Sequence, residues 1–276
     1  MKIKLPLFLI CFLFLIAGCS SLFFYPQREL INNPFLQDVD YRDIFFKTSD
    51  GLKLHGWFLK SKERSNGTVL FLHGNAENIS THVNNVLWLV DNGYDVFIFD
   101  YRGYGKSEGH ASLKGVHIDA GSALETLFSL PYTNKKRIIV FGQSLGGAIA
   151  VYTVANSPHK NAVDALILDS AFSGYRTIAR EKLAAVVITW PFQYPLSFLV
   201  SDYYSPVRWI KKVNPVPVLL LHGDKDTVVA VHHSRIIYNE ALPPKELWVL
   251  EVKGHIAGVR DKDVRGRLLN YLENLP

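Results

Sequence analysis

Gly142-Gln143-Ser144-Leu145-Gly146 stands between an apolar run, residues 138–141, and a run of small and apolar residues, 147–152. This order predicts a strand, a sharp turn and a helix, with Ser144 in the turn. Glycines two residues before and two residues after the serine are needed, because a Cβ at either position would collide with backbone in so tight a turn. The motif is short enough to arise by chance, so its context decides what it means.

Apolar runs alternate with helical patterns along most of the chain. The expected strands are 68–72, 95–100, 138–141, 165–168, 217–221 and 247–252, and the expected helices are 79–92, 116–129, 147–156, 231–240 and 264–273. Strands that are apolar throughout are buried on both faces, as in a parallel sheet. Residues 41–48 and 52–60 instead alternate in polarity around a turn, which predicts an antiparallel hairpin. We therefore expect an α/β fold, with a mostly parallel eight-stranded sheet, an antiparallel start and helices on both faces.

The N-terminus is expected to be a signal peptide, 1–18. Two lysines precede residues 5–18, an apolar run too short for a transmembrane helix. The run ends Leu15-Ile16-Ala17-Gly18-Cys19, which resembles the bacterial lipobox, in which the peptide is cut before a lipidated cysteine. An ordinary signal peptide and an uncleaved anchor are the alternatives.

The resemblance to the lipobox implies a lipid-anchored protein of the bacterial cell envelope, with the membrane as a partner. Ser20 rather than Asp follows the cysteine, which by resemblance to the sorting rule of enteric bacteria favours the outer membrane, facing the periplasm. We expect a lipidated tether, 19–40, followed by one domain, 41–276. With Cys11 removed and Cys19 lipidated, the mature chain would have no thiol for disulfides, catalysis or metal binding.

Composition and charge narrow the class of protein further. The chain has 276 residues, 48% of them hydrophobic, and a net charge of +5 without a basic tract. Nucleic-acid binding is therefore not indicated. The oligomeric state cannot be read from these features.

One segment, 173–206, interrupts the alternation of strands and helices and is rich in aromatic residues. An insertion of this length in a compact domain is usually a functional lid, and a helical excursion without a substrate role is the alternative. Its aromatic side chains would suit an apolar substrate group or contact with a nearby bilayer.

A nucleophilic serine needs a base, and the base needs an orienting acid. In hydrolases of the strand–turn–helix type, the chain order is Ser, then Asp or Glu, then His. His255 follows the last expected strand, and both Asp224 and Asp226 follow the one before it. Since open α/β sheets place their sites at the carboxyl ends of strands, these residues can meet Ser144 there.

From Tyr41 to its end the chain resembles the alpha/beta-hydrolase family. The resemblance implies that the acid is the last residue of the segment His-Gly-x-x-Asp, which selects Asp226 over Asp224. His255 would take the proton from Ser144, and Asp226 would orient its imidazole.

The same resemblance implies an oxyanion hole made of two backbone N–H groups. Leu145 would supply one, and Asn75, the residue after His73-Gly74, the other, with Ala76 as the alternative. We expect His73 to brace this loop rather than to act as a base. The form His-Gly-Asn-Ala resembles a branch that includes lipid-ester hydrolases and depalmitoylating thioesterases.

Two other motifs could suggest a phosphate-binding loop or a metal site, but neither has the required pattern. Residues 100–107 contain Gly-Lys-Ser, but a phosphate-binding loop would need glycine where Asp100 stands. The segment instead resembles a structural loop of the alpha/beta-hydrolases. His232 and His233 are adjacent, and adjacent residues on a helix point about 100° apart, so we expect no metal there and no cofactor.

These features together predict a serine hydrolase of the carboxylesterase, lipase or thioesterase type. It would cleave small-molecule acyl esters or thioesters through an acyl-enzyme on Ser144. An aminopeptidase-like amide hydrolase uses the same residues and stays open. A non-catalytic lipoprotein that binds lipid or protein also stays open, because fold does not guarantee function.

Overall fold

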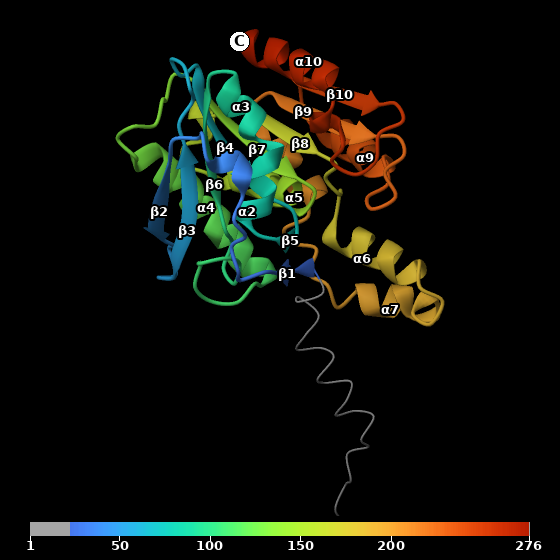
Figure 1. Ribbon diagram of the computed structural model, residues 1–276. Coiled ribbons are helices and arrows are strands. Elements are labelled where there is room, and N and C mark those ends of the chain that lie inside the picture. The colour runs from blue at the N-terminus through green and yellow to red at the C-terminus, as the bar shows by residue number, and fades with distance from the viewer. Residues whose placement is uncertain (1–22, 276) are drawn as a thin grey trace, which may run out of the picture.

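An eight-stranded sheet forms the centre of the protein, in the order β10-β9-β8-β7-β4-β6-β3-β2 (Figure 1). The computed structural model describes residues 23–275, so the predicted signal peptide, 1–18, and Cys19 lie outside the described residues. The strands are β2 (Tyr41–Lys47), β3 (Lys53–Leu59), β4 (Gly67–Leu72), β6 (Tyr94–Phe99), β7 (Ile138–Gln143), β8 (Ala165–Asp169), β9 (Val218–Gly223) and β10 (Lys245–Leu250). In this sheet β3 runs in the opposite direction to the other seven strands. The predicted mixed sheet with an antiparallel start is confirmed.

The strands β4, β6, β7, β8 and β9 are buried on both faces because their alternate side chains enter two different cores. In β4, Leu70 and Leu72 belong to one core, and Val69 and Phe71 belong to the other. The helices α4 (Leu113–Ser129) and α5 (Leu145–Asn156) contribute to the first core, while α3 (Leu87–Asp91) and α10 (Lys262–Glu273) contribute to the second. The predicted helices on both faces are therefore present.

The expected helix 79–92 is wrong as one element. The structure divides it into α2 (Ile79–His82), the 3-10 turn η3 (Val83–Asn85) and α3. Val86 has φ −127° and ψ −5°, which lies outside the helical region, and the indole of Trp88 donates to the carbonyl of Asn85 at 2.9 Å. A side-chain donor thus replaces the missing backbone bond of a continuous helix.

The described part of the predicted tether belongs to the folded domain. Phe24 is buried in the first core, and β1 (Tyr25–Pro26) pairs in parallel with β5 (Ala76–Glu77). The 3-10 turn η2 (Pro34–Leu36) follows, and Leu36 is buried in the second core. From residue 23 onward, this segment is thus held by packing and by backbone hydrogen bonds rather than running free.

The insertion after β8 contains α6 (Tyr175–Ala184), the 3-10 turn η5 (Trp190–Phe192) and α7 (Gln193–Ser197). Figure 1 shows α6 and α7 standing away from the sheet, at the opposite end of the molecule from the C-terminus. The chain returns through α8 (Pro206–Trp209) and the 3-10 turn η6 (Ile210–Val213), and α9 (His232–Glu240) lies between β9 and β10. Within residues 23–275, no helix combines the length and apolar composition that crossing a bilayer would need.

Candidate active site

Ser144 occupies a strained turn between β7 and α5. Its backbone has φ 54° and ψ −117°, a conformation that costs a non-glycine residue free energy. An added Cβ would lie 2.4 Å from the carbonyl oxygen of Gly146 if placed on Gly142, and 2.0 Å from that of Leu72 if placed on Gly146. Backbone contacts on both sides therefore require the two glycines and hold the serine at the first turn of α5.

His255 and Asp226 form a hydrogen-bonded pair at the ends of β10 and β9. His255 Nδ1 lies 2.7 Å from Asp226 Oδ2, so the neutral imidazole donates from Nδ1 and leaves Nε2 free to accept a proton. The other carboxylate oxygen accepts the backbone N–H groups of Val228 and Val229, both at 2.8 Å. Burial would raise the pKa of Asp226, but the hydrogen bonds from His222, His255 and Val229 outweigh it and hold that pKa well below its usual range.

Close backbone contact sets the spacing of this pair. The parallel strands β9 and β10 place Gly223 opposite Leu250, so the two loops leave the sheet side by side. A Cβ on Gly223 would lie 2.2 Å from the carbonyl oxygen of Lys253. Glycine at position 223 thus lets the loop of Asp226 approach the loop of His255.

His222 lies next to the carboxylate of Asp226 and helps to hold it in place. It is fully buried and lies 3.4 Å from Asp226 Oδ2. Its Nε2 donates to the carbonyl of Val229 at 2.7 Å, and its Nδ1 lies 2.6 Å from Ser234 Oγ. The sequence motif contained this histidine, but its spacing alone gave it no role.

The loop after β4 lies against the serine. A Cβ on Gly74 would stand 4.0 Å from Ser144 Cβ, so the backbone of this loop passes directly beside the serine. The carbonyl of Asn75 accepts the N–H of Tyr25 at 2.9 Å and the hydroxyl of Tyr104 at 2.6 Å. The N-terminal segment therefore helps to fix the peptide between Asn75 and Ala76. Leu145, the other predicted oxyanion residue, begins α5, where N–H groups lack partners within the helix.

His73 has the contacts of a bracing residue. It is fully buried, its Nδ1 donates to the carbonyl of Gly74 at 2.8 Å, and its ring stacks on His82 at 5.0 Å. Burial, followed by the neighbouring His82, lowers the pKa of His73 well below its ordinary value. Burial also raises the pKa of Asp100, which accepts the N–H of Ile79, to about 8. The loop after β4 therefore packs on two buried groups, the neutral ring of His73 and the carboxyl group of Asp100, whose pKa is raised.

The segment 100–107 has structural contacts. The guanidinium of Arg102 binds Asp119 at 2.7 Å and Asp50 at 2.9 Å. This pairing ties α4 to the hairpin between β2 and β3. The contacts agree with the structural role that the sequence indicated.

Asp169 and Ser170 connect the serine turn to the histidine loop, and sequence reasoning missed both. The carbonyl of Asp169 accepts the N–H of Ser144 at 2.8 Å, and Ser170 Oγ accepts the N–H of Ile256 at 3.2 Å. Gln143 donates to the Asp169 carboxylate at 2.9 Å, and burial raises the pKa of this carboxyl to about 6. The only signal in the sequence was their place at the end of an apolar strand.

Backbone strain is concentrated at this edge of the sheet. Among residues 23–275, the non-glycine residues with positive φ are Glu77, Ser144, Ser170, Val252 and Ile256. Glu77 ends the short strand β5 in the loop after β4, and the other four follow the carboxyl ends of β7, β8 and β10. Strain of this kind is retained where surrounding structure enforces it, often at functional sites.

The described chain thus brings the predicted site residues to one edge of the sheet. It forms the hydrogen bond between His255 and Asp226, whereas within residues 23–275 no hydrogen bond joins Ser144 Oγ to His255. Such bonds are often long in the absence of substrate and tighten in the complex.

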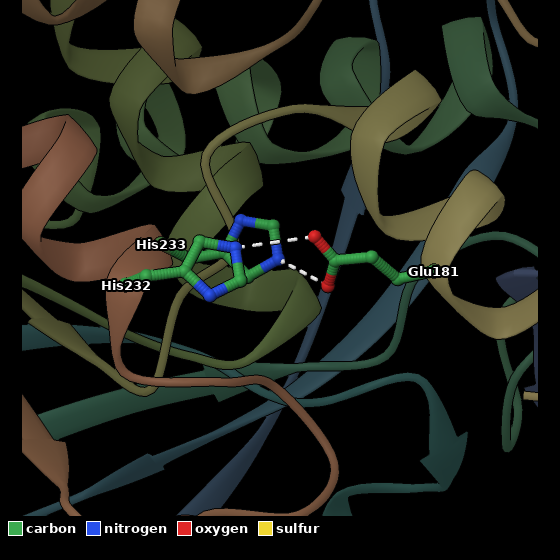
Figure 2. Close-up of side chains that lie close together, drawn as sticks. All are labelled: Glu181, His232 and His233. Atoms are coloured by element: carbon green, nitrogen blue, oxygen red, sulfur yellow. Dashed lines mark hydrogen bonds and ion pairs between the residues drawn. The ribbon is translucent and has the colours of Figure 1, made fainter. Parts of the chain in front are cut away.

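The expectation that His232 and His233 point apart is wrong. Figure 2 shows both rings facing the carboxylate of Glu181 on α6, and they stack at 4.4 Å. His232 Nε2 lies 3.1 Å from one carboxylate oxygen and His233 Nε2 lies 3.0 Å from the other. Position 232 is the first residue of α9, where the side chain can turn back over the next one, so the regular helical angle does not apply.

Although these three side chains converge, the hydrogen bonds of His233 place its proton on the ring nitrogen that faces Glu181, where a metal would have to bind. Its Nδ1 accepts the backbone N–H of Ser173 at 3.1 Å, so the neutral ring carries its proton on Nε2. That N–H donates to Glu181, and a protonated ring nitrogen cannot ligate a metal. The cluster is therefore a clamp that joins the insertion to α9.

Known proteins resemble this chain over most of its length. The sequence model of the family described as "Serine aminopeptidase, S33" matches residues 63–197. The "Uncharacterized protein YfhR" of Escherichia coli (strain K12) is 34% identical over 266 residues, which cover 95% of this chain and 89% of that protein. The "Alpha/beta hydrolase domain-containing protein WAV2" of Arabidopsis thaliana is 35% identical over 217 residues, covering 75% of this chain and 69% of that protein.

Solved structures of esterases share the fold. The Pyrococcus furiosus esterase Pf2001 superimposes with a TM-score of 0.75 at 26% identity, over 92% of this chain and 98% of that chain. Acetyl xylan esterase 1 from Thermoanaerobacterium sp. JW/SL YS485 gives a TM-score of 0.65 at 18% identity, over 93% of this chain and 90% of that chain, a likeness of fold alone. The chain belongs to the alpha/beta-hydrolase family. Within that family it is related to the YfhR proteins and has esterases among its structural neighbours.

Proposed function

We propose that this protein is a serine hydrolase that cleaves carboxylic esters or thioesters through an acyl-enzyme on Ser144. The observation that carries the proposal is the hydrogen bond of 2.7 Å between His255 Nδ1 and Asp226 Oδ2, at the same sheet edge as the strained Ser144. Backbone strain of the kind found at Ser144 is typical of active-site residues.

In the proposed reaction, Ser144 Oγ attacks the carbonyl carbon while His255 Nε2 takes the hydroxyl proton. The carbon–oxygen or carbon–sulfur bond to the leaving group then breaks, and His255 returns the proton to the departing alcohol or thiol. Water, deprotonated by His255, attacks the acyl-enzyme; the bond from the acyl carbon to Ser144 Oγ breaks, the acid is released, and His255 returns the proton to Ser144 Oγ. Asp226 stays ionised throughout and stabilises the imidazolium, since its pKa is held low.

The backbone N–H groups of Leu145 and Asn75 are proposed to stabilise the oxyanion. The support is positional: Leu145 begins α5, and the carbonyl of Gly74, which shares a peptide plane with the N–H of Asn75, accepts His73 Nδ1 while Gly74 lies beside Ser144. Donors of this kind act on charge that develops only in the transition state.

Ester or thioester cleavage is favoured over amide cleavage by the likeness to the Pyrococcus furiosus esterase, at 26% identity over nearly the full length of both chains. An aminopeptidase is the second candidate, because the matching family model is described as a serine aminopeptidase. Both reactions use the same three side chains, so the substrate must be decided by measurement.

We further propose that the protein is a lipid-anchored component of the bacterial cell envelope, attached through Cys19. The support is the sequence Leu15-Ile16-Ala17-Gly18-Cys19 after an apolar run. Phe24, five residues further on, is buried in the folded domain, so the site would work close to the membrane surface.

The experiment is a substrate series of p-nitrophenyl esters of increasing acyl length, acyl-thioesters and aminoacyl amides. We expect turnover of at least one ester or thioester, lost in Ser144→Ala and kept in the matched control Ser129→Ala, which changes an exposed-face serine at the end of α4. Turnover of aminoacyl amides alone would instead establish the aminopeptidase. Turnover that survives Ser144→Ala would contradict the nucleophile.

A further inference from the structure

A continuous segment of the insertion exposes large apolar side chains to solvent. Val187 is 91% exposed, Ile188 79%, Phe198 65% and Trp190 60%. We call these four, together with Phe192 and Tyr194, the aromatic patch. Side chains of this size are normally covered in a soluble protein, and a contiguous group of them marks an interaction surface.

The segment that carries the aromatic patch has no charged residue. Residues 183–201 contain neither Asp, Glu, Lys nor Arg. Charged groups stand at its border instead: Arg176 lies 5.0 Å from the ring of Phe198 and Arg180 lies 5.5 Å from the ring of Tyr194, while Asp202, the acidic residue that follows the segment, is paired with Arg208. Apolar side chains with Trp and Tyr among them, bordered by arginine, are the composition of a surface that enters the interface of an anionic bilayer.

The position of Phe23, the first described residue, supports a bilayer as the partner of the aromatic patch. The ring of Phe23 contacts the ring of Tyr175, the first residue of α6, with centroids 5.7 Å apart. Cys19 precedes Phe23 by four residues, which span at most about 14 Å when extended. An anchor at Cys19 would therefore hold the insertion within reach of the membrane surface.

The aromatic patch also lies on the active-site side of the sheet. The insertion follows the carboxyl end of β8, and the clamp of Glu181 with His233 attaches α6 to α9, close to the loop of Asp226. Lys182 adds a hydrogen bond from α6 to the carbonyl of Val228 in that same loop. A surface docked through this insertion would thus face the edge that holds Ser144.

We propose that the aromatic patch is a membrane-docking surface, which inserts Val187, Ile188 and Trp190 into the interface of the bilayer and turns the active-site edge toward the lipids. The inference goes beyond the proposed hydrolysis, although it uses the proposed anchor at Cys19. A second copy of this chain and an acyl group of the substrate are the other possible occupants, and each gives a different result in the test.

The test uses the full-length protein on phosphatidylcholine vesicles that contain phosphatidylglycerol, brominated near the top of the acyl chains. Vesicle-bound protein is isolated by flotation, and the quenching of Trp190 is the difference between wild type and Trp190→Phe. We expect bromolipids to quench Trp190, because its exposed ring would enter the lipid. The other described tryptophans are buried or partly buried, so their quenching should be weaker. The double change Val187→Ser with Ile188→Ser should reduce this quenching by roughly half or more, since two large apolar side chains no longer enter the lipid.

The matched control is Leu242→Ser with Val249→Ser, which removes two exposed apolar side chains on and before β10 and should leave the quenching unchanged. Flotation without quenching of Trp190 contradicts the docking surface and leaves the anchor intact. A dimer in solution that Val187→Ser with Ile188→Ser dissociates, without quenching, would show a second copy as the occupant.

A short soluble ester separates this inference from the proposed function. The patch variant should hydrolyse that ester as wild type does, because the side chains of Val187 and Ile188 are almost wholly exposed to solvent. Quenching without any turnover would uphold the docking surface and contradict the hydrolase. Loss of turnover of the short ester in the patch variant, with flotation and quenching unchanged, would show that the patch serves the substrate instead.

Discussion

His255 Nδ1 donates to Asp226 Oδ2 across 2.7 Å, while neighbouring Asp224 is engaged elsewhere, accepting the N–H of Val252 at 2.7 Å. Two aspartates separated by one residue thus have different partners. One orients the imidazole, and the other holds the loop that carries it.

The two aspartates should therefore differ sharply under the same substitution. We expect Asp226→Asn to lower kcat for the best ester by about 10³-fold or more, because the imidazole loses both its correct tautomer and the charge that stabilises its protonated form. Asp224→Asn should change kcat by only a few fold. Equal losses in the two variants, measured by steady-state kinetics, would reject Asp226 as the acid.

Alanine should change the stability in opposite directions at two glycines, Gly146 in the serine turn and Gly121 on α4. Gly146→Ala would place a Cβ 2.0 Å from the Leu72 carbonyl oxygen, so we expect a loss of unfolding free energy of several kcal/mol, of the order seen for severe overpacking. Gly121→Ala on α4 meets no atom within 4 Å and should stabilise the protein by up to about 1 kcal/mol. Urea unfolding of both variants measures this, and a tolerated Gly146→Ala would contradict the close packing of this turn.

His117 should make the protein sensitive to acid. It is buried against Tyr204, and burial lowers its pKa to about 3, although its bond to the carbonyl of Leu113 opposes the shift. The folded protein therefore resists a proton that the unfolded chain binds near pH 6.5. The stability that this histidine contributes is complete above pH 6.5 and is lost as the pH falls toward 3, at about 1.4 kcal/mol per pH unit.

The measurement is the unfolding free energy of wild type and His117→Gln between pH 7 and pH 4. The variant should depend less steeply on pH in this window, since it lacks the titrating group. His110→Gln, a change of an exposed histidine, should keep the wild-type slope. Parallel curves for wild type and His117→Gln would show that His117 is protonated in the folded state.

The clamp at Glu181 predicts a defined tautomer. His233 should carry its proton on Nε2, because its Nδ1 accepts the N–H of Ser173 and burial keeps the ring neutral by lowering its pKa. A long-range ¹H–¹⁵N correlation spectrum at neutral pH distinguishes the two tautomers. A proton on Nδ1 would contradict this tautomer, and tight binding of Zn²⁺ that is lost in Glu181→Gln would show that the cluster is a metal site.

The centre of the sheet was predictable because strands β4, β6, β7, β8 and β9 are apolar on both faces, a pattern that buried parallel strands produce and half-exposed strands do not. The turn at Ser144 was predictable because only glycine fits at 142 and 146. The break at Val86 was not, since it depends on the indole of Trp88 finding the carbonyl of Asn85, a local contact with no pattern in the sequence.

The site was predictable only where a motif carried it. Asp226 and His255 follow recognisable strands, whereas Ser170 reaches Ile256 across 86 positions of the chain, and no spacing reveals such a contact. The error at His232 and His233 has a physical cause. The rule for adjacent helical residues fails at the first residue of α9, where the side chain can turn back over its neighbour.

Ser144 is the residue proposed to form the acyl-enzyme. The most direct measurement is mass spectrometry of the purified protein after reaction with a fluorophosphonate, followed by peptide mapping. The proposed mechanism predicts one adduct, on Ser144, that is absent in Ser144→Ala and strongly slowed in His255→Ala. An adduct on another residue, or none in the folded wild-type protein, would contradict it.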